Sequence, residues 1–319
     1  MHTLIPYAMA PGPRCRDALT RLRLPHLEQL LRLLVVEVTD HGTTTDLSPL
    51  HERAIARASG LRAGDGLMPW AALDAQRLGL TTLHGEDGWA WITPCHWSVH
   101  ADHVAMADPM QLALTTKEYE VLHHAMQPYF AGDGITLFAS DLGHHPVRWL
   151  AHGAVLRDLP TASLDRVTGF TVDRWFPRQA QANTLRKLQN EMQMLLYRHP
   201  LNDARANYKL PAVNSFWVSG TGTPDHRAGA IPSAPLKLED GLRAHALKDD
   251  PSGWASAWHA IDNHALAHAV AEIDKGQPVR ITLTGEAQTV TLSQRPDALW
   301  QRLKLRYTAG TATTILGTL

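Results

Sequence analysis

Residues 183–222 read NTLRKLQNEMQMLLYRHPLNDARANYKLPAVNSFWVSGTG, and this stretch decides the predicted fold class. Residues 183–198 place leucine and methionine at helical spacing, which predicts an amphipathic helix. Residues 212–218, AVNSFWV, form a short apolar run typical of a buried strand, and the two glycines that follow predict a turn. Helices that alternate with short buried strands indicate an α/β protein.

The same alternation continues on both sides of this stretch. Pro25 and Pro69 each begin a predicted helix, and Ser48 with Pro49 predicts the start of another. Thr115 and Glu118 have the spacing of a capping box. Further strands are predicted at LIPYA (4–8), VVEV (35–38), RITLTG (280–285) and TVTLS (289–293), and further helices at 254–261, 262–273 and 296–306.

These elements predict a central mixed or mostly parallel sheet flanked by helices. Residues 223–252 are rich in proline, glycine, alanine and charge, which is typical of a linker. We therefore expect a main α/β domain at 1–222, a linker-like segment at 223–252, and a C-terminal helix–strand region at 253–319 that packs on the same sheet.

Composition narrows the class of protein and of partner. The 319 residues are 44% hydrophobic and carry 30 basic and 31 acidic side chains, for a net charge of -1. This balance argues against a nucleic-acid partner. No apolar run is long enough to cross a membrane and no signal peptide is evident, and the two cysteines fit a reducing compartment, so we expect a cytoplasmic protein.

Nineteen histidines are an unusual number and suggest a metal site. The densest cluster is CHWSVHADH at 95–103. If 95–102 is one extended strand, His96, His100 and Asp102 share a face, with His103 close behind. Such ligands suit zinc, manganese or iron. The alternative is a polar strand face that is hydrogen-bonded to its surroundings.

A second candidate site lies around the helix at 183–198. Besides its main apolar stripe, the helix has a second one formed by Asn190, Met194 and Tyr197, so we expect both sides to be covered and Asn190 to be buried. Polar groups follow the helix and the next strand, where a small anion could bind. The predicted ligand-binding residues are Asn190, His199, Asn202, Asp203, Arg205, Asn214, Ser219 and Gly220. The alternative is that Arg205 pairs with an acid and that the amides bridge core strands.

Four blocks resemble those of a proteobacterial family, the RpfE-type regulatory proteins, often labelled phosphoglycerate mutase-like. They are TPCHWSVHADHVAM (93–106), PTASLDRVTG (160–169), LQNEMQMLLYRHPLNDAR (188–205) and PAVNSFWVSGTG (211–222). The last block is also similar to a segment of archaeal-type cofactor-independent phosphoglycerate mutases, which implies an alkaline-phosphatase-like fold. In those enzymes a Ser or Thr nucleophile lies between two metal ions. Here LIPYA lacks their Asp-Gly, and Thr39-Asp40-His41-Gly42 resembles their Asp-His-Gly ligand segment from the other half of the chain.

Three functions remain open from the sequence. The first is a regulatory protein that binds a small anionic ligand or a protein partner and lacks mutase activity. The second is a metal-dependent phosphotransferase or phosphohydrolase, which requires clustered carboxylates and imidazoles. The third is an interaction scaffold, suggested by ten tryptophans.

Overall fold

The computed structural model describes residues 1–80, 87–139, 147–223, 236–294 and 311–319. In it the chain forms two compact units. Unit 1 comprises Met1–Thr45, Pro49–Leu61 and Ala228–Leu319, and unit 2 comprises Asp46–Ser48 and Arg62–Arg227. This division differs from the predicted one, because residues from both ends of the chain build unit 1. The predicted α/β class is confirmed.

Unit 1 is built on a five-stranded mixed sheet with strand order β2-β11-β10-β1-β9. β1 pairs in parallel with both β9 and β10, whereas β11 is antiparallel to β10 and to β2. Part of the predicted linker therefore forms an edge strand of this sheet. The strands are β1 (His2–Ile5), β2 (Val35–His41), β9 (Leu236–Leu238), β10 (Arg280–Thr284) and β11 (Gln288–Ser293).

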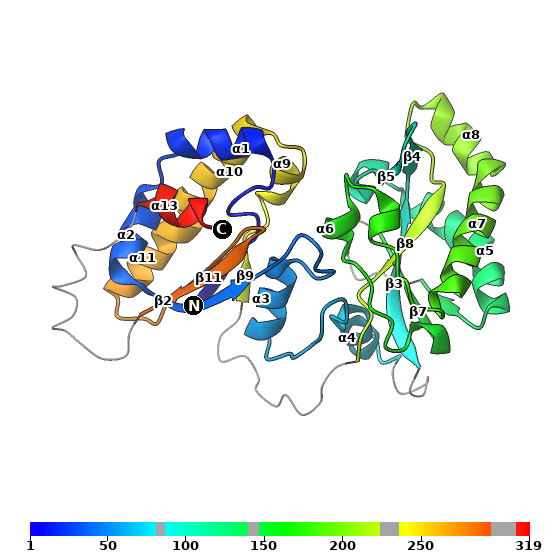
Figure 1. Cartoon of the computed structure of the whole chain (residues 1–319), viewed down its shortest axis with the longest axis horizontal. Helices are drawn as coiled ribbons and strands as arrows, with labels where there is room; N and C mark the ends of the chain where they lie inside the picture. Colours follow the sequence, from blue (N-terminus) through cyan, green and yellow to red (C-terminus); the bar gives the residue numbers. More distant parts are fainter. Residues whose placement is uncertain (81–86, 140–146, 224–235, 295–310) are drawn as a thin grey trace. The chain divides into compact units, whose positions relative to one another are not determined.

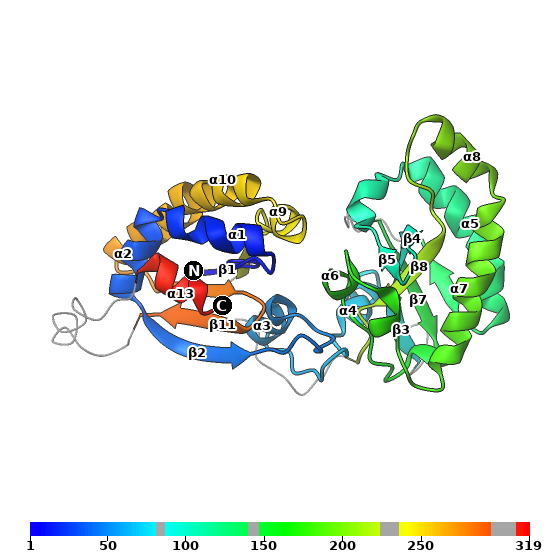
Figure 2. The same cartoon turned by 45° about the horizontal axis from the view of Figure 1, so that its top comes forward.

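Helices cover the apolar face of this sheet, where Ile5, Ile281 and Leu283 meet Trp254 and Trp258 in one core. Figures 1 and 2 show these helices together on one side of the strands. They are α1 (Pro13–Ala18), α2 (Pro25–Leu33), α9 (Arg243–Leu247), α10 (Pro251–Ile261), α11 (Ala267–Asp274) and α13 (Ala312–Gly317). Helix α3 (Leu50–Ala58) contacts β1, β10 and β11 from the opposite face.

Carboxylates from distant parts of unit 1 cap the first two helices. Asp249 accepts hydrogen bonds from the backbone N–H groups of Arg14 and Cys15 at the start of α1, at 3.1 and 2.9 Å. Asp262 lies in a π-helical turn between α10 and α11 and accepts from the N–H groups of His26 and Leu27 at the start of α2. The Asp262 carboxylate therefore caps a helix that precedes it in the chain and not the helix that follows it.

Unit 2 is built on a four-stranded antiparallel sheet with strand order β6-β7-β3-β8. These strands are β3 (Gly88–Cys95), β6 (Thr136–Phe138), β7 (Trp149–Gly153) and β8 (Ser215–Ser219). Helices α5 (Thr116–Gly132) and α7 (Ala182–Tyr197) contact each other and the strands β6 and β8. Helix α4 (Trp70–Arg77) packs its alanines against Trp89 and Leu150 of the sheet.

Smaller elements complete unit 2. They are β4 (Trp97–Val99), β5 (Val104–Met106), α6 (Leu164–Val167), α8 (Pro200–Asn207) and the 3-10 turns η2 (Pro109–Leu112), η3 (Ala154–Leu156) and η4 (Val172–Arg174). Unit 1 contains one further 3-10 turn among the described residues, η1 (Leu19–Arg21). The Thr115–Glu118 capping box is confirmed. The N-cap of α3 is Pro49 and not Ser48, whose hydroxyl instead accepts from Gly66 N–H. The helix expected at 296–306 lies outside the described residues. No described helix has the length and apolarity to cross a bilayer.

Candidate functional site

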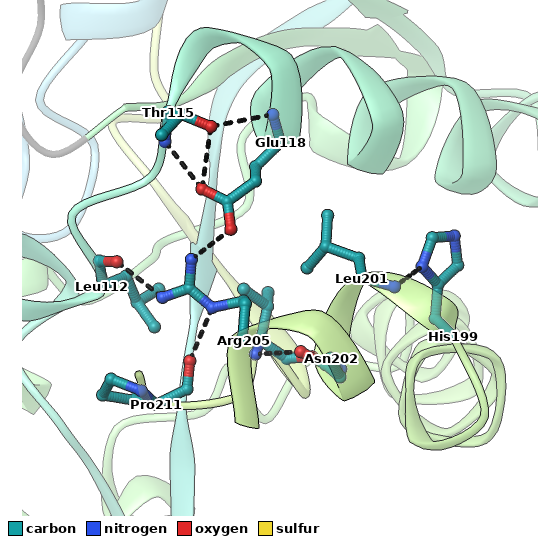
Figure 3. Close-up of polar contacts among 9 residues, drawn as sticks. Leu112, Thr115, Glu118, His199, Leu201, Asn202, Arg205 and Pro211 are labelled. Carbon is teal, nitrogen blue, oxygen red and sulfur yellow. Dashed lines mark hydrogen bonds and ion pairs between the residues drawn. The ribbon is translucent and has the colours of Figure 1, made fainter. Parts of the chain in front are cut away.

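Arg205, the central residue of the predicted anion site, is buried, with 1% of its surface exposed. Its Nη1 donates to Glu118 Oε1 at 2.7 Å, its Nε to the Pro211 carbonyl at 2.7 Å, and its Nη2 to the Leu112 carbonyl at 2.6 Å. Figure 3 shows the guanidinium enclosed by these three acceptors. The guanidinium therefore ties α8 to the start of α5, which favours the structural alternative for this residue.

The two asparagines of this region also bind backbone. Asn202 donates to the carbonyls of Leu196 and Val213 and accepts from the Val213 N–H, each at 2.8 Å. Asn214 accepts from the Trp97 N–H at 2.7 Å and donates to the Trp97 carbonyl at 2.9 Å. Each amide thus replaces a missing strand partner and fixes a loop against the sheet.

Of the remaining predicted residues around α7, one caps a helix and two are exposed. His199 is the N-cap of α8, and its Nδ1 accepts from the Leu201 N–H at 3.2 Å. Asp203 and Asn190 are exposed. The expectation of a buried Asn190 was wrong, because Met194 and Tyr197 on the same face are 77% and 84% exposed. The buried amide is Gln189, whose Nε2 donates to the Phe216 carbonyl at 3.1 Å.

The metal candidates do not share a strand face. The strand ends at Val99, and His100 to His103 form the turn between β4 and β5, closed by a hydrogen bond from His100 N to His103 O. His96 lies at the opposite end of β4, where its Nδ1 hydrogen-bonds to the Ala212 carbonyl at 2.8 Å. Within the described ranges, no three His, Cys, Asp or Glu side chains are placed to hold a metal ion.

Three of these candidates do meet at the tip of the hairpin. The rings of His100 and His103 stack at 4.6 Å, and His103 Nδ1 hydrogen-bonds to Asp102 Oδ1 at 2.6 Å. This hydrogen bond holds the pKa of the Asp102 carboxyl below its usual value. Asp102 is 84% exposed, so the pair contributes little to the stability of the fold.

The predicted residues Ser219 and Gly220 lead into the loop after β8, which is fixed by hydrogen bonds. The side chain of Thr221 in this loop is fully buried. Its hydroxyl donates to the Leu159 carbonyl at 2.6 Å and lies 2.8 Å from the hydroxyl of Thr161. The Gly220 carbonyl accepts from Ala71 N–H in the first turn of α4. These contacts hold the loop in one position against α4 and β3.

Both glycines of the loop are required by close approach. Gly220 has a φ of 70°, and a Cβ there would lie 2.7 Å from the indole ring of Trp91. Gly222 has a φ of 133°, and a Cβ there would collide with the Leu67 carbonyl. The backbone N–H groups of Thr221 and Gly222 meet no acceptor among the described residues. Two adjacent donors at the end of a buried strand are suited to bind an anion.

A cation stacks on the Trp91 ring that Gly220 also contacts. The Arg148 guanidinium carbon is 3.3 Å from the centre of the Trp91 ring. The same indole donates from Nε1 to Asp74 Oδ2 at 3.0 Å, and Asp74 also pairs with Arg77 at 3.2 Å. Trp91 is thereby held by α4 on its edge, by Gly220 and by Arg148.

The sequence prediction missed Trp91, Arg148 and Asp74. Trp91 alternates with Trp89 along a recognisable strand, which predicts a common face, but nothing in the sequence relates it to Arg148 or Asp74. Arg148 directly precedes β7, and this strand lies in a stretch rich in Trp, Pro and Gly (141–180) whose pattern predicts no regular strand.

Comparison with known proteins gives only distant matches. No family model and no curated protein matches the sequence. A cofactor-independent phosphoglycerate mutase from Thermoplasma acidophilum DSM 1728 is similar, with 14% identity over 94% of this chain and 90% of that chain and a TM-score of 0.36. PH0037 protein from Pyrococcus horikoshii is similar with 12% identity, coverage of 92% and 87%, and a TM-score of 0.43. At these values neither match assigns an activity or a site to this chain.

Proposed function

We propose that this protein is a regulatory binding protein without mutase activity, and that unit 2 binds a small phosphorylated or carboxylated metabolite at the loop Ser219–Gly222. One observation carries the proposal. The adjacent N–H groups of Thr221 and Gly222 meet no acceptor among the described residues. Gly220 of the same loop packs against the Trp91 ring, on which the Arg148 guanidinium also stacks. Backbone donors and a guanidinium together are the usual partners of a carboxylate or phosphate.

The four blocks that resemble RpfE-type proteins support unit 2 as the binding unit. They span about 93–222 and lie inside its boundaries. Many of their polar side chains (among them Asn202, Arg205 and Asn214) bind backbone and fix the shape of the unit. These side chains do not accept from the backbone N–H groups of Thr221 and Gly222, which therefore remain available to a ligand. The absence of Asp-Gly from LIPYA agrees with a protein that lacks mutase chemistry.

The test is calorimetric titration of the full chain with phosphorylated and carboxylated metabolites, on wild type and on Arg148→Met. We expect Arg148→Met to weaken binding by about 1.5–3 kcal/mol, as for a lost charge-assisted hydrogen bond. Arg157→Met is the matched control, since Arg157 is a half-exposed arginine of the same unit that pairs with Asp87. Equal affinities of Arg148→Met and wild type would overturn the proposal.

The two other functions are distinguishable in the same preparation. Metal-dependent release of phosphate from a phosphomonoester would favour the phosphotransferase or phosphohydrolase. A wild-type protein that binds none of the metabolites would leave the interaction scaffold as the better hypothesis.

A further inference from the structure

The face of the unit 1 sheet that α3 covers carries a row of polar residues. Asp40 on β2, Thr289 on β11 and Thr284 on β10 are successive partners across the sheet, so their side chains project from one face. Arg53 and Arg57 of α3 each pair with Asp40 at 2.7 Å, which identifies this face as the one beneath α3. The opposite face carries the apolar residues Leu283 and Val290.

Two neighbouring rows of this face differ in their hydrogen bonds. Thr282 and Thr291 are partners across β10 and β11, and their hydroxyls are 3.0 Å apart, with His2 Nε2 2.9 Å from Thr282. In the next row, Thr284 and Thr289 are each 1% exposed, and neither hydroxyl has a hydrogen-bond partner among the described residues. A buried hydroxyl without a partner costs about 1–3 kcal/mol, so two in one row indicate a missing polar group.

The first turn of α3 lies one row further along this face, at Gly42, two residues after Asp40 in the chain. A Cβ on Gly42 would lie 2.9 Å from Leu50 Cγ, and Gly42 N–H donates to the carbonyl of Ala287 in the turn that joins β10 and β11. The N-cap of α3 is Pro49, and no side chain caps the helix within the described residues. The start of a helix carries a partial positive charge and attracts anions. On the same row as the two threonines, Asp40 pairs with the guanidinium groups of both Arg53 and Arg57.

We infer that Thr284 and Thr289 bind a small oxyanion, a phosphate or a carboxylate, beneath the first turn of α3. Each hydroxyl donates one hydrogen bond to the anion, and the start of α3 supplies the positive potential. This site belongs to unit 1 and is separate from the proposed metabolite site of unit 2.

The experiment measures binding of inorganic phosphate and of acetate, by calorimetry and thermal shift at constant ionic strength. It uses the full chain carrying Arg148→Met, which removes the charge of the unit 2 site. Thr284→Val and Thr289→Val keep the side-chain shape and remove the hydroxyl. The matched control is Thr3→Val, because Thr3 is equally buried and its hydroxyl also lacks a partner, but it projects from the opposite face.

We expect each of Thr284→Val and Thr289→Val to weaken anion binding by about tenfold or more, and Thr3→Val to leave it unchanged. The preference between phosphate and acetate then identifies the class of oxyanion. No anion binding to the Arg148→Met chain, or an equal loss in Thr3→Val, would overturn the inference. Valine variants that bind anion as before and melt at a higher temperature would also overturn it, since the row would then hold at most a water molecule.

Discussion

Arg205 Nη1 lies 2.7 Å from Glu118 Oε1, although the two residues are 87 positions apart in the chain. Glu118 also accepts, through Oε2, the backbone N–H and the hydroxyl of Thr115, each at 2.9 Å. One carboxylate thus caps α5 and neutralises the buried guanidinium of α8. Burial alone would raise the pKa of Glu118, but the hydrogen bonds from Thr115 and Arg205 outweigh it and keep the pKa below its usual value.

Arg205→Met should destabilise the protein by about 3–5 kcal/mol, because it leaves a partly buried carboxylate and two carbonyls without their donor. Chemical denaturation of wild type and variant measures this difference. Arg198→Met is the control, since Arg198 is exposed at the end of α7 and should change stability little. A variant of wild-type stability that no longer binds anions would show instead that Arg205 is a ligand-binding residue.

The stability of unit 1 should fall as the pH decreases from about 6.5 to about 4. Burial, and next the charge of Arg280, lower the pKa of His2 from 6.5 to about 4. The unfolded chain then binds a proton over this interval that the folded chain does not, so acid favours unfolding. Denaturation midpoints across this pH range should vary less in His2→Gln than in wild type. His268→Gln, at an exposed histidine, is the control variant.

Neither cysteine of the native protein should react with a thiol reagent. Cys15 and Cys95 are free and buried. Burial, with a hydrogen bond to Asp249, raises the pKa of the Cys15 thiol to about 12, and burial raises the pKa of Cys95 as well. Both groups are therefore uncharged thiols at neutral pH, which react slowly. Titration under non-reducing conditions should find two reactive thiols after denaturation; a stoichiometric disulfide would contradict this.

The metal content of the untagged protein should be the same in wild type and in the double variant His96→Ala/Asp102→Ala. The two side chains lie at opposite ends of β4, too far apart for one ion. Elemental analysis for zinc, manganese and iron makes the comparison. If the double variant lost a stoichiometric metal, the sequence-based assignment would be right and the described separation of His96 would not hold in solution.

Local signals in the sequence were reliable where the partner lies nearby in the chain. The Thr115–Glu118 capping box needs only three residues of helix, and its spacing alone identifies it. The second role of Glu118 could not be predicted, because it depends on Arg205 on another helix. Likewise, Asp262 is followed in the chain by α11, which it could cap. Its carboxylate instead binds the start of α2, more than 230 residues earlier in the chain.

The sequence predicted a buried amide on α7 but assigned it to Asn190, one residue away from the amide that is buried, Gln189. Gln189 and Asn190 are both amides, and the count of apolar positions assigned burial to Asn190. The row of Met194 and Tyr197 suggested a second covered side, but both side chains are exposed. Whether an apolar stripe is covered depends on its neighbours in three dimensions, which one sequence does not contain.

The construction of unit 1 from both ends of the chain sets an order for folding during synthesis. All residues of unit 2 have been translated once Arg227 emerges from the ribosome, so this unit is able to fold first. β1 then still awaits its partners β9 and β10, and α1 and α2 still await the carboxylates of Asp249 and Asp262. The N-terminal segment therefore cannot complete its sheet or its helix caps until the residues after Arg227 have been made.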